Sequence, residues 1–212
     1  MNYFELVNKC LVELSYKQVN AFSELTKNDH KKIKNIINVI NTEVCGYDNW
    51  NFKLRKTTLS LPANQSELEN SVDGKIASLV IDGHVYKYFE KPEVFITGKA
   101  PSHTYSSFND TLLLPEFDEA KQINVVYYTS NTAKTAEGTE KKALENEEDT
   151  SLIPDVYAEP ILVYGTCMRL KSNPQHVKFS YWLSMYNSAL ANMRSKISVD
   201  ANYAPSVKLK RY

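Results

Sequence analysis

Residues 149–170 read DTSLIPDVYAEPILVYGTCMRL, and this stretch decides where the last helical part of the chain begins. Pro154 suits the first turn of a helix, because the backbone N–H that proline lacks has no helical partner there. Pro160 is harder to place, because inside a helix it removes a hydrogen bond and clashes with the preceding turn. Two interpretations follow. Either residues 154–159 form a separate turn and the main helix begins at Pro160, or the helix is kinked at Pro160.

Downstream of this stretch, apolar residues recur at helical spacing. Asn173-Pro174 ends the first helix, and a second is predicted over residues 175–197. The short connection predicts an antiparallel helical hairpin. The stripe of the second helix consists of Phe179, Trp182, Tyr186, Ala189, Met193 and Ile197, so Trp182 is predicted to be a core residue.

Upstream, the N-terminal part is also predicted to be helical. One helix covers residues 3–14, and a second begins near Thr26 with an isoleucine-rich stripe. Lys31, Lys32 and Lys34 lie mostly off that stripe. They are the best candidates for contact with nucleic acid or a neighbouring subunit, although a solvated helix face is the ordinary reading of such a cluster.

The middle of the chain, residues 51–130, has the β-branched and tyrosine-rich runs that are typical of strands. Asp82-Gly83 between two such runs predicts a hairpin with a type I′ turn. Residues 130–150 carry almost no large apolar side chain and many glutamates, which predicts a mobile or exposed loop.

These patterns predict an α+β fold: a helical bundle, made of the N-terminal helices and the C-terminal αα-hairpin, with an inserted antiparallel β-rich domain and an extended C-terminal arm. The predicted parts are N-terminal helices (1–50), the β-rich insertion (51–130), a polar acidic loop (131–150), the helical hairpin that completes the bundle (151–197) and the arm (198–212).

Composition limits the classes of function. The chain has 212 residues, 42% of them hydrophobic and 24% charged, with a net charge of zero, so it is not a uniformly basic nucleic-acid-binding protein. Three scattered cysteines argue against a disulfide framework and fit a reducing compartment. Neither a secretory signal nor a membrane-spanning run is present in the sequence, so we expect a soluble protein.

Recognisable catalytic patterns are also missing. The four histidines, His30, His84, His103 and His176, do not have metal-ligand spacing, and surface positions are expected for His30, His84 and His176. There is no GxSxG or phosphate-binding glycine loop, so no cofactor and no metal are predicted. Trp50, in DNWNF, is read as a packing anchor. The best candidate for a pair of catalytic carboxylates is the group Glu116, Asp118 and Glu119. Such a group is more often a solvated turn than the carboxylate pair of a glycosidase.

The order of several short motifs resembles that of a known family, the tail-tubular-A group of head-to-tail adaptor (connector) proteins of short-tailed bacteriophages. The N-terminal helical segment ends at a W-x-F element, residues 50–52. The phrases TLSLP (58–62), LLLP (112–115) and VVYY (125–128) follow, and then an acidic start of a helix containing IPD, within residues 149–155. The resemblance covers roughly residues 1–197.

This resemblance implies a non-enzymatic structural protein of the virion, made in the cytoplasm of the host bacterium and located at the head–tail junction. Such proteins form a ring, usually of twelve copies, between the portal protein and the tail tube, nozzle or fibre proteins. The ring extends the channel through which DNA is ejected, without sequence recognition and without contact with a membrane.

The resemblance also implies that a C-terminal arm binds the portal. The end of this chain suits that role, because it alternates apolar residues with cations and cannot form a core by itself. The predicted portal-binding residues are Tyr203, Pro205, Val207, Lys208, Leu209, Lys210, Arg211 and Tyr212.

Two alternatives from other functional classes remain open. One is a cell-wall hydrolase of a phage tail that uses Glu116, Asp118 or Glu119. The other is a sugar-binding module that uses exposed aromatic side chains of the middle sheet.

Overall fold

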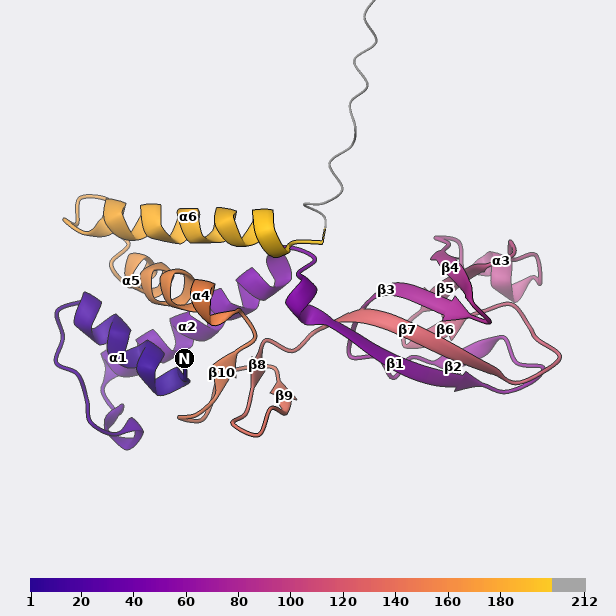
Figure 1. Ribbon diagram of the computed structural model, residues 1–212, viewed down its shortest axis with the longest axis horizontal. Coiled ribbons are helices and arrows are strands. Elements are labelled where there is room, and N and C mark those ends of the chain that lie inside the picture. Colours follow the sequence, from indigo (N-terminus) through magenta and orange to yellow (C-terminus); the bar gives the residue numbers. More distant parts are fainter. Residues whose placement is uncertain (200–212) are drawn as a thin grey trace, which may run out of the picture. The chain divides into compact units, whose positions relative to one another are not determined.

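A computed structural model describes residues 1–199 of the chain. It divides into two compact units (Figure 1). Unit 1 consists of Met1–Lys53 together with Asn131–Tyr212, and unit 2 is Leu54–Ser130. The predicted arm residues, Tyr203 to Tyr212, lie outside the described residues. Within residues 1–199, no helix combines the length and the apolar character needed to cross a membrane.

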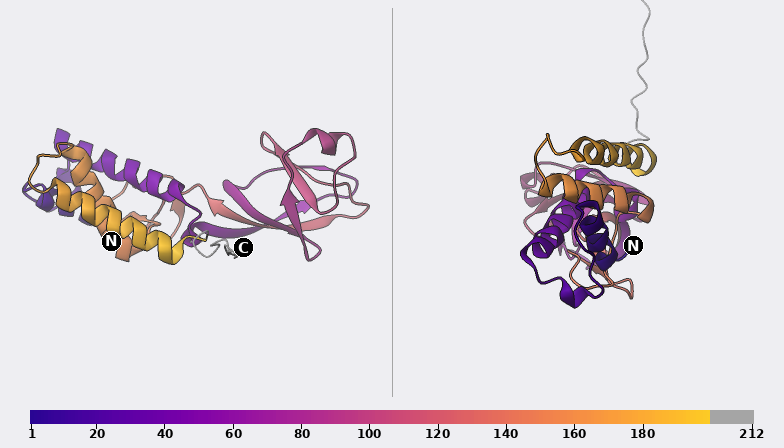
Figure 2. Two further views of the ribbon diagram at one scale, coloured as in Figure 1. Left: turned by 90° about the horizontal axis from the view of Figure 1, so that it is seen from above. Right: turned by 90° about the vertical axis from the view of Figure 1, so that its left-hand side faces the viewer.

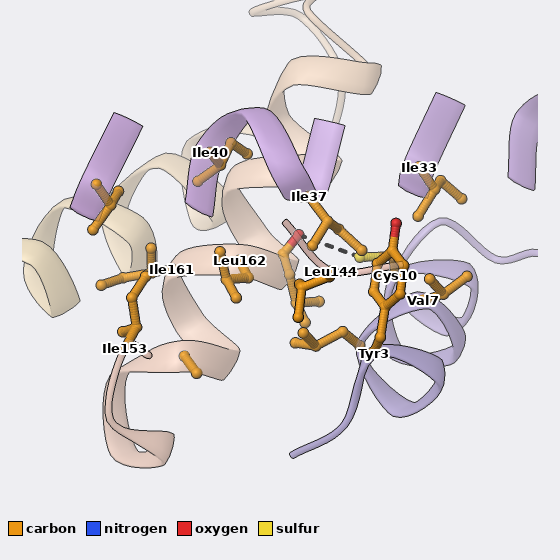
Figure 3. Packing of buried hydrophobic residues seen from close by; sticks show 14 of the residues in the cluster. Tyr3, Val7, Cys10, Ile33, Ile37, Ile40, Leu144, Ile153, Ile161 and Leu162 are labelled. Atoms are coloured by element: carbon orange, nitrogen blue, oxygen red, sulfur yellow. Dashed lines mark hydrogen bonds between the residues drawn. The ribbon is translucent and has the colours of Figure 1, made fainter. Parts of the chain in front are cut away.

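Unit 1 is built around two N-terminal helices, α1 (Tyr3–Glu13) and α2 (Asn28–Tyr47), with a short 3₁₀ turn η1 (Phe22–Glu24) between them. Asn2 caps α1 in a capping box with Glu5, which satisfies two backbone N–H groups at the start of the helix. Ile33, Ile37 and Ile40 of the isoleucine stripe of α2 are fully buried, and Figure 3 shows them packed against residues of α1 and of the later helical segments. The prediction of two amphipathic helices is confirmed here.

The stretch with two prolines forms one helical run. It comprises α4 (Asp155–Ala158), a π-helical turn η3 (Glu159–Val163) and α5 (Tyr164–Leu170). Pro160 lies in the π turn. A π turn is wider than an α turn, which accommodates a ring that would otherwise clash with the preceding carbonyl. The thiol of Cys10 lies 3.9 Å from the carbonyl oxygen of Val163 and helps to satisfy the irregular turn.

Residues 131–150 are in part the exposed segment that their composition predicted, since Glu137, Glu145, Glu147 and Glu148 are exposed, but they are also anchored to unit 1. They contribute three short strands, β8 (Ala133–Lys134), β9 (Glu140–Lys141) and β10 (Thr150–Ser151), paired in the order β10-β8-β9. Leu144 is buried, and its backbone N–H and carbonyl both bond to the side chain of Asn38 on α2, at 2.9 and 2.8 Å. Hydrogen bonds to polar side chains therefore fix this segment to unit 1, where other segments rely on a large apolar surface.

Unit 2 is a curled, seven-stranded sheet (Figure 2). Its strands are β1 (Leu54–Leu61), β2 (Glu67–Glu69), β3 (Gly74–Ile81), β4 (His84–Tyr88), β5 (Thr104–Phe108), β6 (Thr111–Leu113) and β7 (Lys121–Thr129), and they pair in the order β1-β7-β3-β4-β5-β6-β2. Asp82 and Gly83 join β3 to β4 with φ angles of 50° and 80°. These are the angles of a type I′ turn, so the predicted hairpin is confirmed.

The predicted fold class is wrong in its architecture. The chain mixes helices and strands, but it is not a helical bundle that carries a small antiparallel insertion. The seven-stranded sheet is large and mixed, because β4 and β5 run parallel after the chain crosses over through α3 (Glu93–Ile96). Unit 1 also contains its own sheet. Strand pairing depends on contacts between distant segments, which the local patterns of the sequence do not specify.

Candidate interaction surface

The last described helix, α6 (Phe179–Ile197), is fixed to unit 1 by one narrow stripe. Its buried side chains are Trp182, Ala189 and Met193, and Tyr186, Leu190 and Ile197 are partly buried beside them. The indole N–H of Trp182 donates to Glu13 at 3.1 Å, and the ring stacks on His176 with 5.1 Å between centroids. The predicted core position of Trp182 is therefore confirmed. These contacts hold the helix rigidly and leave the rest of its circumference exposed.

The exposed side of α6 carries no charge over most of its length. No Asp, Glu, Lys, Arg or His occurs from Phe179 to Met193, although 24% of the chain is charged. The large apolar side chains Tyr181, Leu183 and Met185, with exposed fractions of 49%, 37% and 36%, lie along the borders of this side. The positions between the borders are small or polar: Ser180, Ser184, Asn187, Ser188 and Ala191. Helix faces in contact with water normally carry charged residues, and depletion of charge together with aromatic and methionine side chains is typical of the centre of protein–protein interfaces.

We refer to the exposed side of α6 as the α6 face; Tyr181 and Met185 lie along one border of it and Leu183 along the other, because residues two apart on a helix point in opposite directions. The ring of Tyr181 packs edge-on against the ring of Tyr164, with 5.5 Å between centroids. Cations appear only in the last turn, where Arg194 bonds to Asp48 at 2.9 Å. The α6 face is therefore a pre-formed surface that binding would not have to order, which favours affinity.

The basic residues predicted as channel or neighbour contacts do not form a single patch. Lys31 and Lys32 are exposed on α2. The ammonium of Lys34 instead lies 4.3 Å from the ring centroid of Phe22 and 5.7 Å from that of Tyr3. Two of the three lysines thus face outward, while the third makes cation–π contacts within unit 1.

The carboxylates of the hydrolase alternative, Glu116, Asp118 and Glu119, are exposed beside a shallow pocket of about 320 Å³. Lys121, which also lines this pocket, is paired with Asp82 at 2.8 Å. A glycosidase holds one carboxylate in an apolar environment so that it stays protonated, whereas these three lie on an open turn.

The aromatic alternative has a clearer cavity. Tyr88 and Tyr105 meet edge to face, with 5.6 Å between centroids, at a cavity of about 410 Å³ in unit 2. Ser107 and Asn70 supply polar groups to its lining. This combination of aromatic wall and few polar groups is typical of small-molecule pockets.

One of the environments that the sequence predicted for the histidines is wrong. His30 is buried, not solvated, because α2 turns it towards the core of unit 1. His84 and His103 lie close together in unit 2, with ring centroids 4.7 Å apart. In the described part of the chain, no three His, Cys, Asp or Glu side chains converge in a way that would hold a metal ion.

Sequence reasoning missed the α6 face. The signal was present as the uncharged run from Phe179 to Met193, but that run was read only for its buried stripe. No protein-family model matches this chain, and no curated protein matches it in sequence.

Proposed function

We propose that this chain is a non-enzymatic ring adaptor of a bacteriophage virion that joins the portal protein to the tail. The observation that carries the proposal is the α6 face, an uncharged helix surface bordered by the exposed Tyr181 and Met185 on one side and by Leu183 on the other. A surface of this kind suits a large protein partner, because a flat helix face buries too little of a small ligand to bind it.

The portal protein is the partner that we assign to the α6 face. In the chain, the predicted portal-binding residues 203–212 follow α6 within a few positions. The helix face and those residues would then contact one partner together, and linkage of two contacts increases affinity without a new contact surface. The exposed Lys31 and Lys32 would face the DNA channel or a neighbouring copy.

The proposal is tested by light scattering after size exclusion, on the full chain alone and mixed with the portal protein of the same genome. We expect a ring, alone or formed on the portal. Leu183→Glu and Met185→Glu place a charge in the α6 face and should weaken portal binding by about tenfold or more, since charge is disfavoured in an interface centre.

Asn35→Glu provides the matched control, because it adds the same charge at an exposed position of another helix, α2. Removal of residues 200–212 should also weaken portal binding. A folded monomer that ignores the portal would contradict the proposal. That result would favour the sugar-binding alternative. This alternative predicts that the monomer binds a neutral oligosaccharide and that Tyr88→Ala abolishes this binding.

A further inference from the structure

Within residues 1–199, the sheet of unit 2 ends at two edge strands, β1 and β2. At one end, β1 pairs only with β7, and at the other, β2 pairs only with β6; no strand within residues 1–199 pairs with their outer sides. β1 is eight residues long and runs in continuous register along β7, from Leu54 opposite Tyr128 to Leu61 opposite Lys121. It has neither a bulge nor a proline, two devices that normally prevent a long edge strand from recruiting another strand.

The two edges carry opposite charges on the same face of the sheet. On β1, Lys56 is exposed and alternates with inward residues such as Leu59. On β2, Glu67 and Glu69 are exposed on either side of the inward Leu68. Because side chains alternate along a strand, Lys56 and the two glutamates lie on the outer face, while Leu59 and Leu68 lie on the inner, apolar face.

This arrangement favours contact between unlike edges. If β1 of one copy lies beside β2 of another, the cation and the carboxylates approach on the outer face. At the same time, Leu59 and Leu68 extend the apolar inner layer. Pairing of β2 with a second β2 would instead bring four carboxylates together, and like charges on adjacent strands are destabilising.

We propose that copies of this chain associate through β1 of one copy and β2 of the next. This inference deepens the proposed ring adaptor, because it names the surface through which its copies would bind one another. The contact joins two different surfaces, so each copy retains one free edge for a further copy. Such head-to-tail contacts form a closed ring when the rotation between copies closes.

The test uses sedimentation velocity of the full chain over a range of concentrations, alone and with the portal protein. Lys56→Glu, and separately Glu67→Lys with Glu69→Lys, place like charges at the contact and should each weaken self-association by about tenfold or more. Lys99→Glu makes the same change of charge at an exposed position away from both edges and should have no effect.

A charge swap supplies the decisive comparison. A 1:1 mixture of the two reversed proteins, or the chain that carries all three substitutions, places opposite charges at the contact again. Self-association should return to within about threefold of the wild-type strength. This recovery also shows that the single variants are folded.

Zero-length carbodiimide coupling provides a second measurement. In a mixture of ¹⁵N-labelled and unlabelled chains, we expect amide links between Lys56 of one copy and Glu67 or Glu69 of another. The proposal is overturned if the reversed charges do not weaken association, if the swap does not restore it, or if no mixed-isotope link forms. An edge contact that passes these tests but gives only a dimer would refute the ring adaptor and leave the contact established.

Discussion

Replacement of Asp149 by asparagine removes a buried charge that holds residues 141–149 in place. One carboxylate oxygen of Asp149 accepts hydrogen bonds from the backbone N–H groups of Glu145 and Asn146, at 2.6 and 2.7 Å, and from the ammonium of Lys141, at 2.9 Å. The backbone carbonyl of Asp149 accepts a further bond from the N–H of Tyr3, at 2.8 Å. This residue therefore ties the 141–149 segment to the start of α1.

The expected loss of stability can be worked out from these contacts. The Asp149 side chain is only 2% exposed. Hydrogen bonds to a charged group contribute about 1.5–3 kcal/mol each, and removal of one partner of a buried ion pair costs about 3–5 kcal/mol. Asparagine keeps one acceptor oxygen but adds an amide that cannot accept. We therefore expect Asp149→Asn to lower the free energy of unfolding of unit 1 by about 3 kcal/mol.

Urea unfolding followed by tryptophan fluorescence measures this change specifically. Both tryptophans, Trp50 and Trp182, lie in unit 1 and are fully buried, so the signal reports unit 1 alone. Glu145→Gln is the control, because Glu145 also pairs with Lys141, at 2.7 Å, but its side chain is 67% exposed. An exposed pair contributes less than about 1 kcal/mol.

The pH dependence gives a second check on the same group. Burial would raise the pKa of Asp149, but the N–H groups of Asn146 and Glu145 and the ammonium of Lys141 together lower this pKa below its ordinary value. A carboxylate with a lowered pKa in the folded state stabilises the fold above the unfolded pKa, near 3.9, and loses that contribution as the pH falls through the folded value. The difference between wild type and Asp149→Asn should therefore shrink below about pH 4. A difference under about 1 kcal/mol at pH 7, or one that does not change with pH, would refute the anchoring role of Asp149.

Three further changes have defined outcomes. Trp182→Ala should cost about 3–5 kcal/mol by urea unfolding followed by circular dichroism, because the indole is fully enclosed; a loss below about 1 kcal/mol would contradict its core role. Gly74→Ala should disrupt the pairing of β3 with β7, because an added Cβ would lie 2.1 Å from the carbonyl oxygen of Tyr128; unchanged amide exchange in unit 2 would refute this. Burial raises the pKa of the Cys10 thiol and raises that of the Cys45 thiol to about 12. All three thiols are buried and should react with a disulfide reagent only as unit 1 unfolds, whereas fast reaction in the native state would contradict their burial. The thiols are Cys10, Cys45 and Cys167.

Local chemistry explains where the sequence was a reliable guide. The stripes of α1, α2 and α6 could be predicted, because a helix repeats its contacts every 3.6 residues and each stripe needs only one apolar neighbour. The turn at Asp82-Gly83 could be predicted for a similar reason, since a type I′ turn requires positive φ at two adjacent residues. Trp50 and Trp182 were expected to be packing residues, and both are fully buried.

Predictions failed where a distant partner decides the outcome. Residues 131–150 are too polar to indicate burial, yet Asn38 and the donors around Asp149 satisfy their polar groups and hold them in unit 1. His30 is buried because it lies three residues before Ile33 on the buried stripe of α2, a spacing that the prediction of a surface histidine overlooked. The π turn at Pro160 has two causes. The proline ring cannot fit an α turn, and the residues around it, Ile161, Leu162 and Val163, are buried in the core of unit 1.

The sequence by itself determined the stripes of α1, α2 and α6, the strand-rich character of residues 51–130, the tight turn and the uncharged run from Phe179 to Met193. Each of these depends on residues that are close together in the chain. Only the tertiary structure decided which side of this run is exposed on α6, and that β1 and β2 form the two ends of one sheet. The physical reason is that the packing of distant segments sets both the exposure of a helix face and the order of strands in a sheet. Contacts between segments that are far apart in the chain leave no periodic pattern in the sequence.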